Sequence, residues 1–146
     1  MTTTSNPNPN TAPTPGRISR RLIVLSISMI LALLLQVIVG VANALWLTVP
    51  ETGNGWATAA PLLLLNAHLL LGTAITGLGL WLFIEALRTR HGIWIISSIV
   101  GLLGVVVALG GGSAFLSTNG SAVFSFMMAI GCVIAIGAYL APVVKR

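Results

Sequence analysis

The chain has 146 residues, of which 56% are hydrophobic and only 6% are charged, with a formal net charge of +5. A soluble domain carries about 25% charged residues, so this composition cannot cover a surface that faces water. The mean hydropathy of +1.02 agrees. We therefore expect the chain to be surrounded by lipid, and the placement of its basic residues, taken up below, excludes nucleic acid as a partner.

The first 16 residues, MTTTSNPNPNTAPTPG, form a polar, low-complexity segment. Pro and Asn disfavour regular structure, and the segment has almost no apolar side chains to bury. We predict a disordered cytoplasmic tail over residues 1–20 and a transmembrane domain over 21–146. The apolar run that follows is about 25 residues long, which exceeds the roughly 7–15 of a signal peptide. A cleaved leader, which would leave three spans, stays as an alternative.

Four stretches are long and apolar enough to cross a membrane, which takes about 20 residues per helix. They cover residues 22–46, 61–87, 93–115 and 121–144, and none contains Lys, Arg or Asp. The turn between the second and third stretches is short, so these two must be antiparallel neighbours. We predict an all-α fold, a four-transmembrane-helix bundle with up-down-up-down topology.

All basic residues fall on one side of such a bundle. They precede the first span, lie between the second and third, or follow the fourth: Arg17, Arg20, Arg21, Arg88, Arg90, Lys145 and Arg146. Since basic loops stay in the cytoplasm, both termini are predicted to be cytoplasmic, in a multi-pass protein of the plasma membrane.

Other residues mark the two membrane boundaries. Tryptophan prefers the interface, and we expect two at the outer face and two near the inner face: Trp46 and Trp56, then Trp81 and Trp94. Glu85 is the only acidic residue within a span and stands three residues before Arg88. At that spacing on a helix we expect an ion pair.

Each span has a stripe of small or polar residues at helical spacing, which lets lipid-embedded helices pack closely. The stripes are Gln36, Gly40 and Asn43 or Ala44; His68, Gly72, Ile75 or Thr76, and Gly79; Ser97, Gly101, Gly104, Ala108, Gly111 and Phe115; Phe124, Met128, Gly131 and Ala135. We interpret them as the inward faces of the bundle. The alternative is that some of them face a membrane-protein partner or a second copy of the chain.

One polar residue is conspicuous inside the second span, in the run LLLLNAHLLLG. Ionisable residues within the membrane are costly and count as functional hypotheses. His68 lies at the same depth as Met127 and Met128 of the fourth span. A haem within a four-helix bundle takes axial ligands from facing helices, and His with Met is an accepted pair. We place a hypothetical haem b site at His68 and Met128, with Met127 as the second choice.

Two amides in the outer half would support such a site. Gln36 or Asn66 could hydrogen-bond the second imidazole nitrogen of His68 or a haem propionate. Two other interpretations of His68 remain open: a structural hydrogen-bonding residue, and a group that handles protons or contacts a substrate. The haem iron is the only metal in this hypothesis, because there is no cluster of residues at copper- or zinc-ligand spacing.

The segments HLLLGTAI and GGGSAFL, with SFMMAIG in the fourth span, resemble small uncharacterised four-helix membrane proteins of actinobacterial type. More faintly, they are similar to one half of the haem A synthase fold and to cytochrome b561-like bundles. That resemblance implies haem bound between helices by paired histidines. His68 matches a ligand position, whereas Met127 and Met128 stand where a second histidine is expected, and the acidic residues of haem A synthase are absent.

Three functions follow from these observations. The first is an accessory or interaction subunit of a larger membrane complex, with no catalytic residues of its own. The second is an electron-transfer protein with haem b held by His68 and Met128. The third is a small transporter or channel, for which the sequence lacks the buried carboxylates usual in such proteins.

Overall fold

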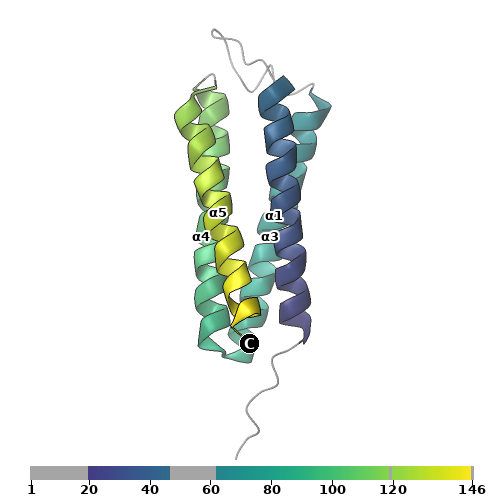
Figure 1. Ribbon diagram of the computed structural model, residues 1–146, viewed down its shortest axis with the longest axis vertical. Coiled ribbons are helices and arrows are strands. Elements are labelled where there is room, and N and C mark those ends of the chain that lie inside the picture. The colour runs from purple at the N-terminus through teal and green to yellow at the C-terminus, as the bar shows by residue number, and fades with distance from the viewer. Residues whose placement is uncertain (1–19, 47–61, 119, 146) are drawn as a thin grey trace, which may run out of the picture.

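The computed structural model describes residues 20–46, 62–118 and 120–145, and in these residues it contains helices and no strands. The helices are α1 (Arg20–Trp46), α3 (Leu63–Thr89), α4 (Gly92–Ser117) and α5 (Ala122–Val144), which run up and down side by side (Figure 1). All four are long and apolar enough to span a membrane. The predicted four-helix fold is confirmed, and the chain is a polytopic membrane protein. The predicted tail lies almost wholly outside the described residues.

The predicted spans agree with the helices to within about two residues at most ends. The turn between α3 and α4 is as short as predicted. Arg90 adopts a left-handed conformation there, with φ of 55°, and its backbone N–H bonds to the carbonyl of Leu87. That geometry ends α3 and turns the chain into α4 directly after His91. The two helices are therefore antiparallel neighbours, as expected.

Helices α4 and α5 form the tightest pair, because glycines face each other across their contact. A Cβ atom on Gly104 would lie 2.7 Å from the carbonyl oxygen of Gly131, and one on Gly131 would lie 2.5 Å from that of Gly104. Ala108 and Ala135 continue this contact. Small residues thus bring the two backbones together, as is common between helices in lipid.

Helices α1 and α3 are joined by polar side chains. The amide of Asn43 donates to the carbonyl oxygen of Leu64 at 3.3 Å. Seven residues earlier on α1, the amide of Gln36 donates to the carbonyl oxygen of His68 at 3.1 Å. The two acceptors are four residues apart on α3, so both amides act along one seam. We call this pair of contacts the amide seam.

At the start of α3, Leu65 packs against Leu116 near the end of α4, whereas the main core shared by the two helix pairs lies in the other half of the bundle. Their common core there includes Met29, Leu82 and Tyr139, all fully buried or nearly so. A Cβ on Gly101 would collide with the phenol ring of Tyr139, and one on Gly79 would lie 3.2 Å from the hydroxyl. The absence of side chains at these two glycines therefore makes room for the tyrosine.

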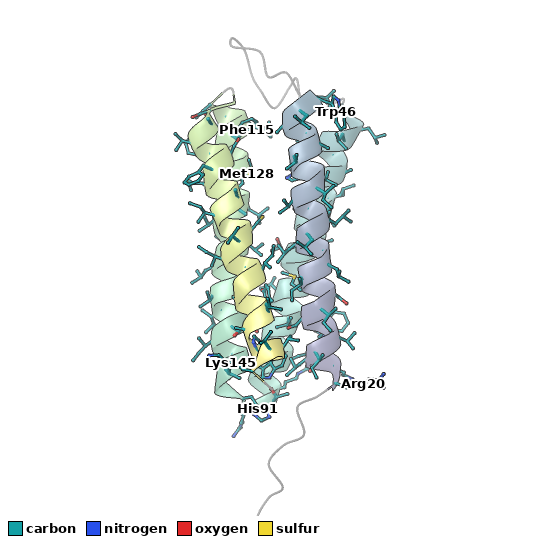
Figure 2. The ribbon with its side chains drawn as sticks, in the orientation of Figure 1. Arg20, Trp46, His91, Phe115, Met128 and Lys145 are labelled. Atoms are coloured by element: carbon teal, nitrogen blue, oxygen red, sulfur yellow. The ribbon has the colours of Figure 1, made fainter. Side chains whose placement is uncertain are left out.

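The charged residues lie at the end of the bundle nearest this core. Arg20, His91 and Lys145 gather there, whereas Trp46 and Phe115 lie at the other end (Figure 2). We call these the basic end and the opposite end. The predicted ion pair is present, with Arg88 Nη1 2.9 Å from Glu85 Oε1.

Three of the four tryptophans can be compared with their predicted positions. Trp46 and Trp81 are exposed near opposite ends of the bundle, as interfacial residues should be. Trp94 is at the basic end as predicted, but only 1% of it is exposed, because it packs against Leu22 and Ala86. Trp56 lies outside the described residues.

Candidate functional site: a cleft between two helix pairs

In the half towards the opposite end, the two helix pairs enclose a cleft of about 670 Å³. It is lined by residues of all four helices, most of them apolar. Leu33, Ile75 and Val105 close it where the common core begins. Leu116 and Gly120 border it near the end of the bundle. The cleft therefore lies between the α1–α3 pair and the α4–α5 pair, which contact each other again at its edge, where Leu65 packs against Leu116.

His68 and Gln36 line this cleft from the α1–α3 side. The side-chain nitrogen of Gln36 is 3.1 Å from His68 Nε2 and 3.1 Å from the His68 carbonyl oxygen. Since an amide nitrogen only donates, Nε2 accepts, and the proton of the neutral imidazole is assigned to Nδ1. The predicted hydrogen bond between Gln36 and the imidazole is present in this form.

The imidazole is turned towards α1. A Cβ on Gly40 would lie 3.2 Å from His68 Cε1, so the glycine lets the ring pack against the helix. His68 Nδ1 and Gln36 Oε1 are buried and have no hydrogen-bond partner among the described residues. The amide group of Gln36 thus donates across two helices, while one donor, His68 Nδ1, and one acceptor, Gln36 Oε1, are left without a partner among the described residues.

Met128 lines the cleft from α5. Its sulfur packs on α4, where a Cβ on Gly112 would lie 3.3 Å from it. Met127, the second choice of ligand, is exposed and is not part of the cleft wall, and neither is Asn66. The structure therefore brings His68, Gln36 and Met128 to one cleft and leaves Met127 and Asn66 outside it.

Part of the cleft wall on α5 was not predicted from the sequence. Ser125, Ala129 and Cys132 line it together with Met128. Cys132 is half-buried and is the only cysteine of the chain. These three small residues recur at intervals of four and three, which places them on one helix face. That spacing could have identified this face of α5 from the sequence. The face lies next to the stripe of Gly131 and Ala135, which packs against α4.

The position of His68 bears on the haem hypothesis. Iron binding needs an imidazole lone pair, and the one on Nε2 already accepts the Gln36 hydrogen bond. In this arrangement the histidine does not fit as a ligand, and it would fit only after that bond opens and the ring turns from α1. The described residues also contain no group of three or more His, Cys, Asp or Glu side chains that could hold a metal ion.

Comparison with protein-family models, with curated proteins and with solved structures finds no match to this chain. The similarity to haem A synthase is therefore unsupported. Functional inference depends on the cleft and on the chemistry of the residues around it.

Proposed function

We propose that this protein is a non-catalytic binding protein of the plasma membrane, which holds a lipid-soluble molecule in the cleft between its helix pairs. It would act as an accessory or interaction subunit of a larger membrane complex. The observation that carries this proposal is the cleft itself, about 670 Å³ in volume and lined mostly by apolar side chains. Ligand sites in proteins are usually about 300–1,000 Å³ and mainly apolar.

The size of the cleft favours a small molecule over a partner helix. A helix with its side chains is about 10–12 Å across, and the space between the pairs is closed at its base by Leu33, Ile75 and Val105. A chain of methylene or isoprene units would fill such a space and replace contacts that the helices lack there. Burial of each CH₂ group contributes about 0.8 kcal/mol when the group leaves water. A molecule that is already dissolved in lipid does not gain this contribution, so it would bind because its shape fits the cleft.

A binding role is also supported by what the polar groups do. The amides of Gln36 and Asn43 bond to α3, and the hydroxyl of Ser98 bonds to the carbonyl oxygen of Trp94 in its own helix. The two amides hold α1 and α3 together and the hydroxyl bonds within α4, so these three groups do not converge on a reacting atom. A transporter function stays a prediction that these polar groups do not support. Glu85, the acidic residue within the spans, is paired with Arg88 near the basic end.

The proposed orientation places the basic end in the cytoplasm. The described basic residues Arg20, Arg21, Arg88, Arg90 and Lys145 all belong to helix ends or turns at that end. Loops rich in Arg and Lys are retained on the cytoplasmic side. In this orientation both termini are cytoplasmic, and the cleft lies in the outer half of the membrane.

The test is to purify the protein in mild detergent, extract it with organic solvent and quantify the retained lipid-soluble molecules by mass spectrometry. We expect about one molecule of a defined class per chain. Ala129→Trp places a large side chain in the cleft and should abolish retention of this molecule. Ile130→Trp, on the neighbouring residue that faces away from the cleft, should retain it. Equal retention by the two variants, or none by the unmodified chain, would refute the proposal.

A haem b electron-transfer protein is the second candidate, favoured by the presence of both His68 and Met128 in the wall of one cleft. His68 would hold the iron with Met128 only after its bond to Gln36 opens and the ring turns from α1, and the group would then supply one-electron chemistry. The visible spectrum of protein expressed with added haem tests it. A Soret band that is lost in His68→Ala would support haem and displace the lipid proposal. A colourless protein would remove this candidate.

A further inference from the structure

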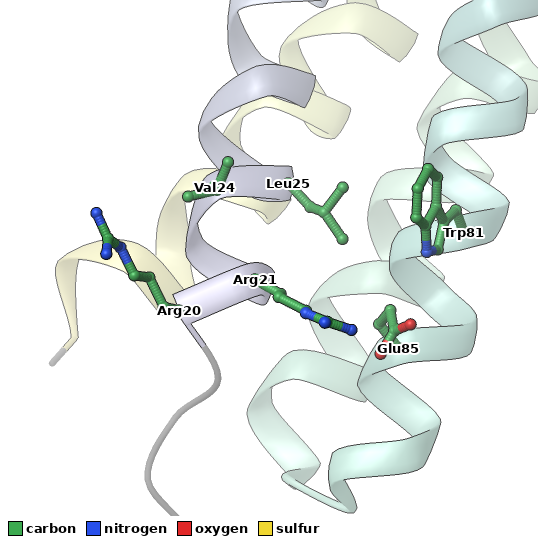
Figure 3. A pocket seen from close by; sticks show the side chains of 6 residues that line it. All are labelled: Arg20, Arg21, Val24, Leu25, Trp81 and Glu85. Carbon is green, nitrogen blue, oxygen red and sulfur yellow. The ribbon is translucent and has the colours of Figure 1, made fainter.

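A second hollow lies outside the bundle, at the basic end. It is a groove of about 440 Å³ between α1 and α3, far from the cleft. Its wall consists of Val24, Leu25 and Trp81, with charged residues at its mouth (Figure 3). The charged residues are Arg20, Arg21 and Glu85. We call it the interfacial groove.

The mouth of the interfacial groove has an excess of positive charge. Glu85 is bonded to Arg88 at 2.9 Å, so its carboxylate already has a guanidinium partner. Arg21 extends from α1 towards Glu85 on α3, while Arg20 projects from α1 in the opposite direction, away from Trp81 and Glu85 (Figure 3). Neither Arg20 nor Arg21 forms an ion pair within the described parts of the chain. Arg21 and Arg88 therefore flank one carboxylate, and the groove is cationic at its mouth and apolar within.

We propose that the interfacial groove binds an anionic phospholipid, with the phosphate at Arg21 and one acyl chain along Val24, Leu25 and Trp81. Guanidinium groups bind phosphate oxygens in a bidentate manner and are less strongly hydrated than ammonium groups. The exposed Trp81 ring, near the same depth as the arginines, is suited to the region where headgroup and acyl chain meet. Basic pockets between transmembrane helices are recognised lipid headgroup sites.

This lipid is distinct from the molecule proposed for the cleft. The interfacial groove lies on the lipid-facing side of α1 and α3 at the basic end, and no residue lines both hollows. A lipid held there would contact both helices, so it would reinforce the α1–α3 pair at the end opposite to the amide seam.

Native mass spectrometry of the detergent-purified protein with equal amounts of phosphatidylglycerol and phosphatidylcholine tests the proposal. We expect phosphatidylglycerol adducts to dominate. A charge that contacts the headgroup contributes about fivefold in affinity, so Arg21→Gln should reduce the preference about fivefold. Arg90→Gln removes a charge from the same end but not from the groove, and should leave the preference unchanged.

A variant that should change the lipid preference in the opposite direction controls for arginine variants that misfold or that insert into the membrane in the reverse orientation. Glu85→Gln removes the carboxylate from the groove and leaves every basic residue in place, so the preference for phosphatidylglycerol should rise. Equal binding of the two lipids by the unmodified chain would overturn the proposal. So would a loss in Arg90→Gln as large as that in Arg21→Gln, or no increase in Glu85→Gln.

Discussion

The side-chain nitrogen of Gln36 lies 3.1 Å from both the Nε2 atom and the carbonyl oxygen of His68. One amide therefore satisfies two acceptors of a single residue on the neighbouring helix. This contact fixes the imidazole against α1 and makes His68 part of the amide seam. In the described arrangement, the histidine that first suggested a cofactor site serves to join two helices.

The first prediction concerns this contact. Gln36→Leu and His68→Leu should each destabilise the protein, and the double variant should lose less than the sum of the two. Interhelical hydrogen bonds in membranes are worth about 0.6 kcal/mol on average and about 1.7 at most, so we expect a coupling energy of about 1 kcal/mol. Unfolding titrations in mixed detergent give the three free energies. Strict additivity would mean that the two side chains do not act together.

The second prediction concerns the contact between α4 and α5. Gly131→Ala places a Cβ within 2.5 Å of the Gly104 carbonyl oxygen, so the helices must move apart, and overpacking of this kind costs about 1–3 kcal/mol. Gly137→Ala is the matched control on the same helix, since a Cβ there meets nothing within 4 Å. It should be neutral or slightly stabilising. The thermal unfolding of the two variants in detergent separates these outcomes, and equal losses would disprove the close backbone contact.

The third prediction concerns Tyr139. Its hydroxyl is buried and has no hydrogen-bond partner among the described residues. A buried polar group without a partner costs about 1–3 kcal/mol, so Tyr139→Phe should keep or raise the stability of the protein while the ring still fills the space beside Gly101. A loss of more than 1 kcal/mol in the same unfolding assay would reveal a partner for the hydroxyl, such as an internal water.

The fourth prediction concerns orientation. Alkaline phosphatase fused after Trp46 should be active in a bacterial host, because the enzyme folds only outside the cytoplasm, whereas the fusion after Arg90 should be inactive. Antibody detection of both fusions controls for their expression. The reverse pattern of activity would place the basic end outside and would contradict the positive-inside argument.

Much of the fold follows from the sequence. Span length and the scarcity of charge define the four helices, and helical spacing identifies faces that the structure buries, such as Gly72 and Gly79 on α3 and Gly104 on α4. The ion pair of Glu85 and Arg88 follows from their spacing alone. These features are local, because they depend on one helix and its periodicity.

The features that escaped prediction depend on how the helices are paired. Equal stripes on four helices suggest a uniform bundle, whereas in the structure α4 and α5 pack most closely. Beyond Val105 a cleft lies between the two helix pairs, although Leu65 and Leu116 still make contact there. Nothing in the sequence indicates that the ring of Tyr139 would occupy the space that a side chain at Gly101 of α4 would need. It also places His68 and Met128 at one depth without showing that the imidazole turns to α1. Which helices touch, and over what length, depends on contacts between distant parts of the chain.

The existence of the cleft is tested most directly by a nitroxide spin label on Cys132, the only cysteine of the chain, in lipid-depleted protein. The label should project into the cleft and give a mobile electron paramagnetic resonance spectrum. Ala129→Trp, one helical turn away in the same wall, should immobilise it, whereas Ile130→Trp should not. A label that is already immobile in the unmodified chain, or that responds equally to both variants, would contradict a cleft between the two helix pairs.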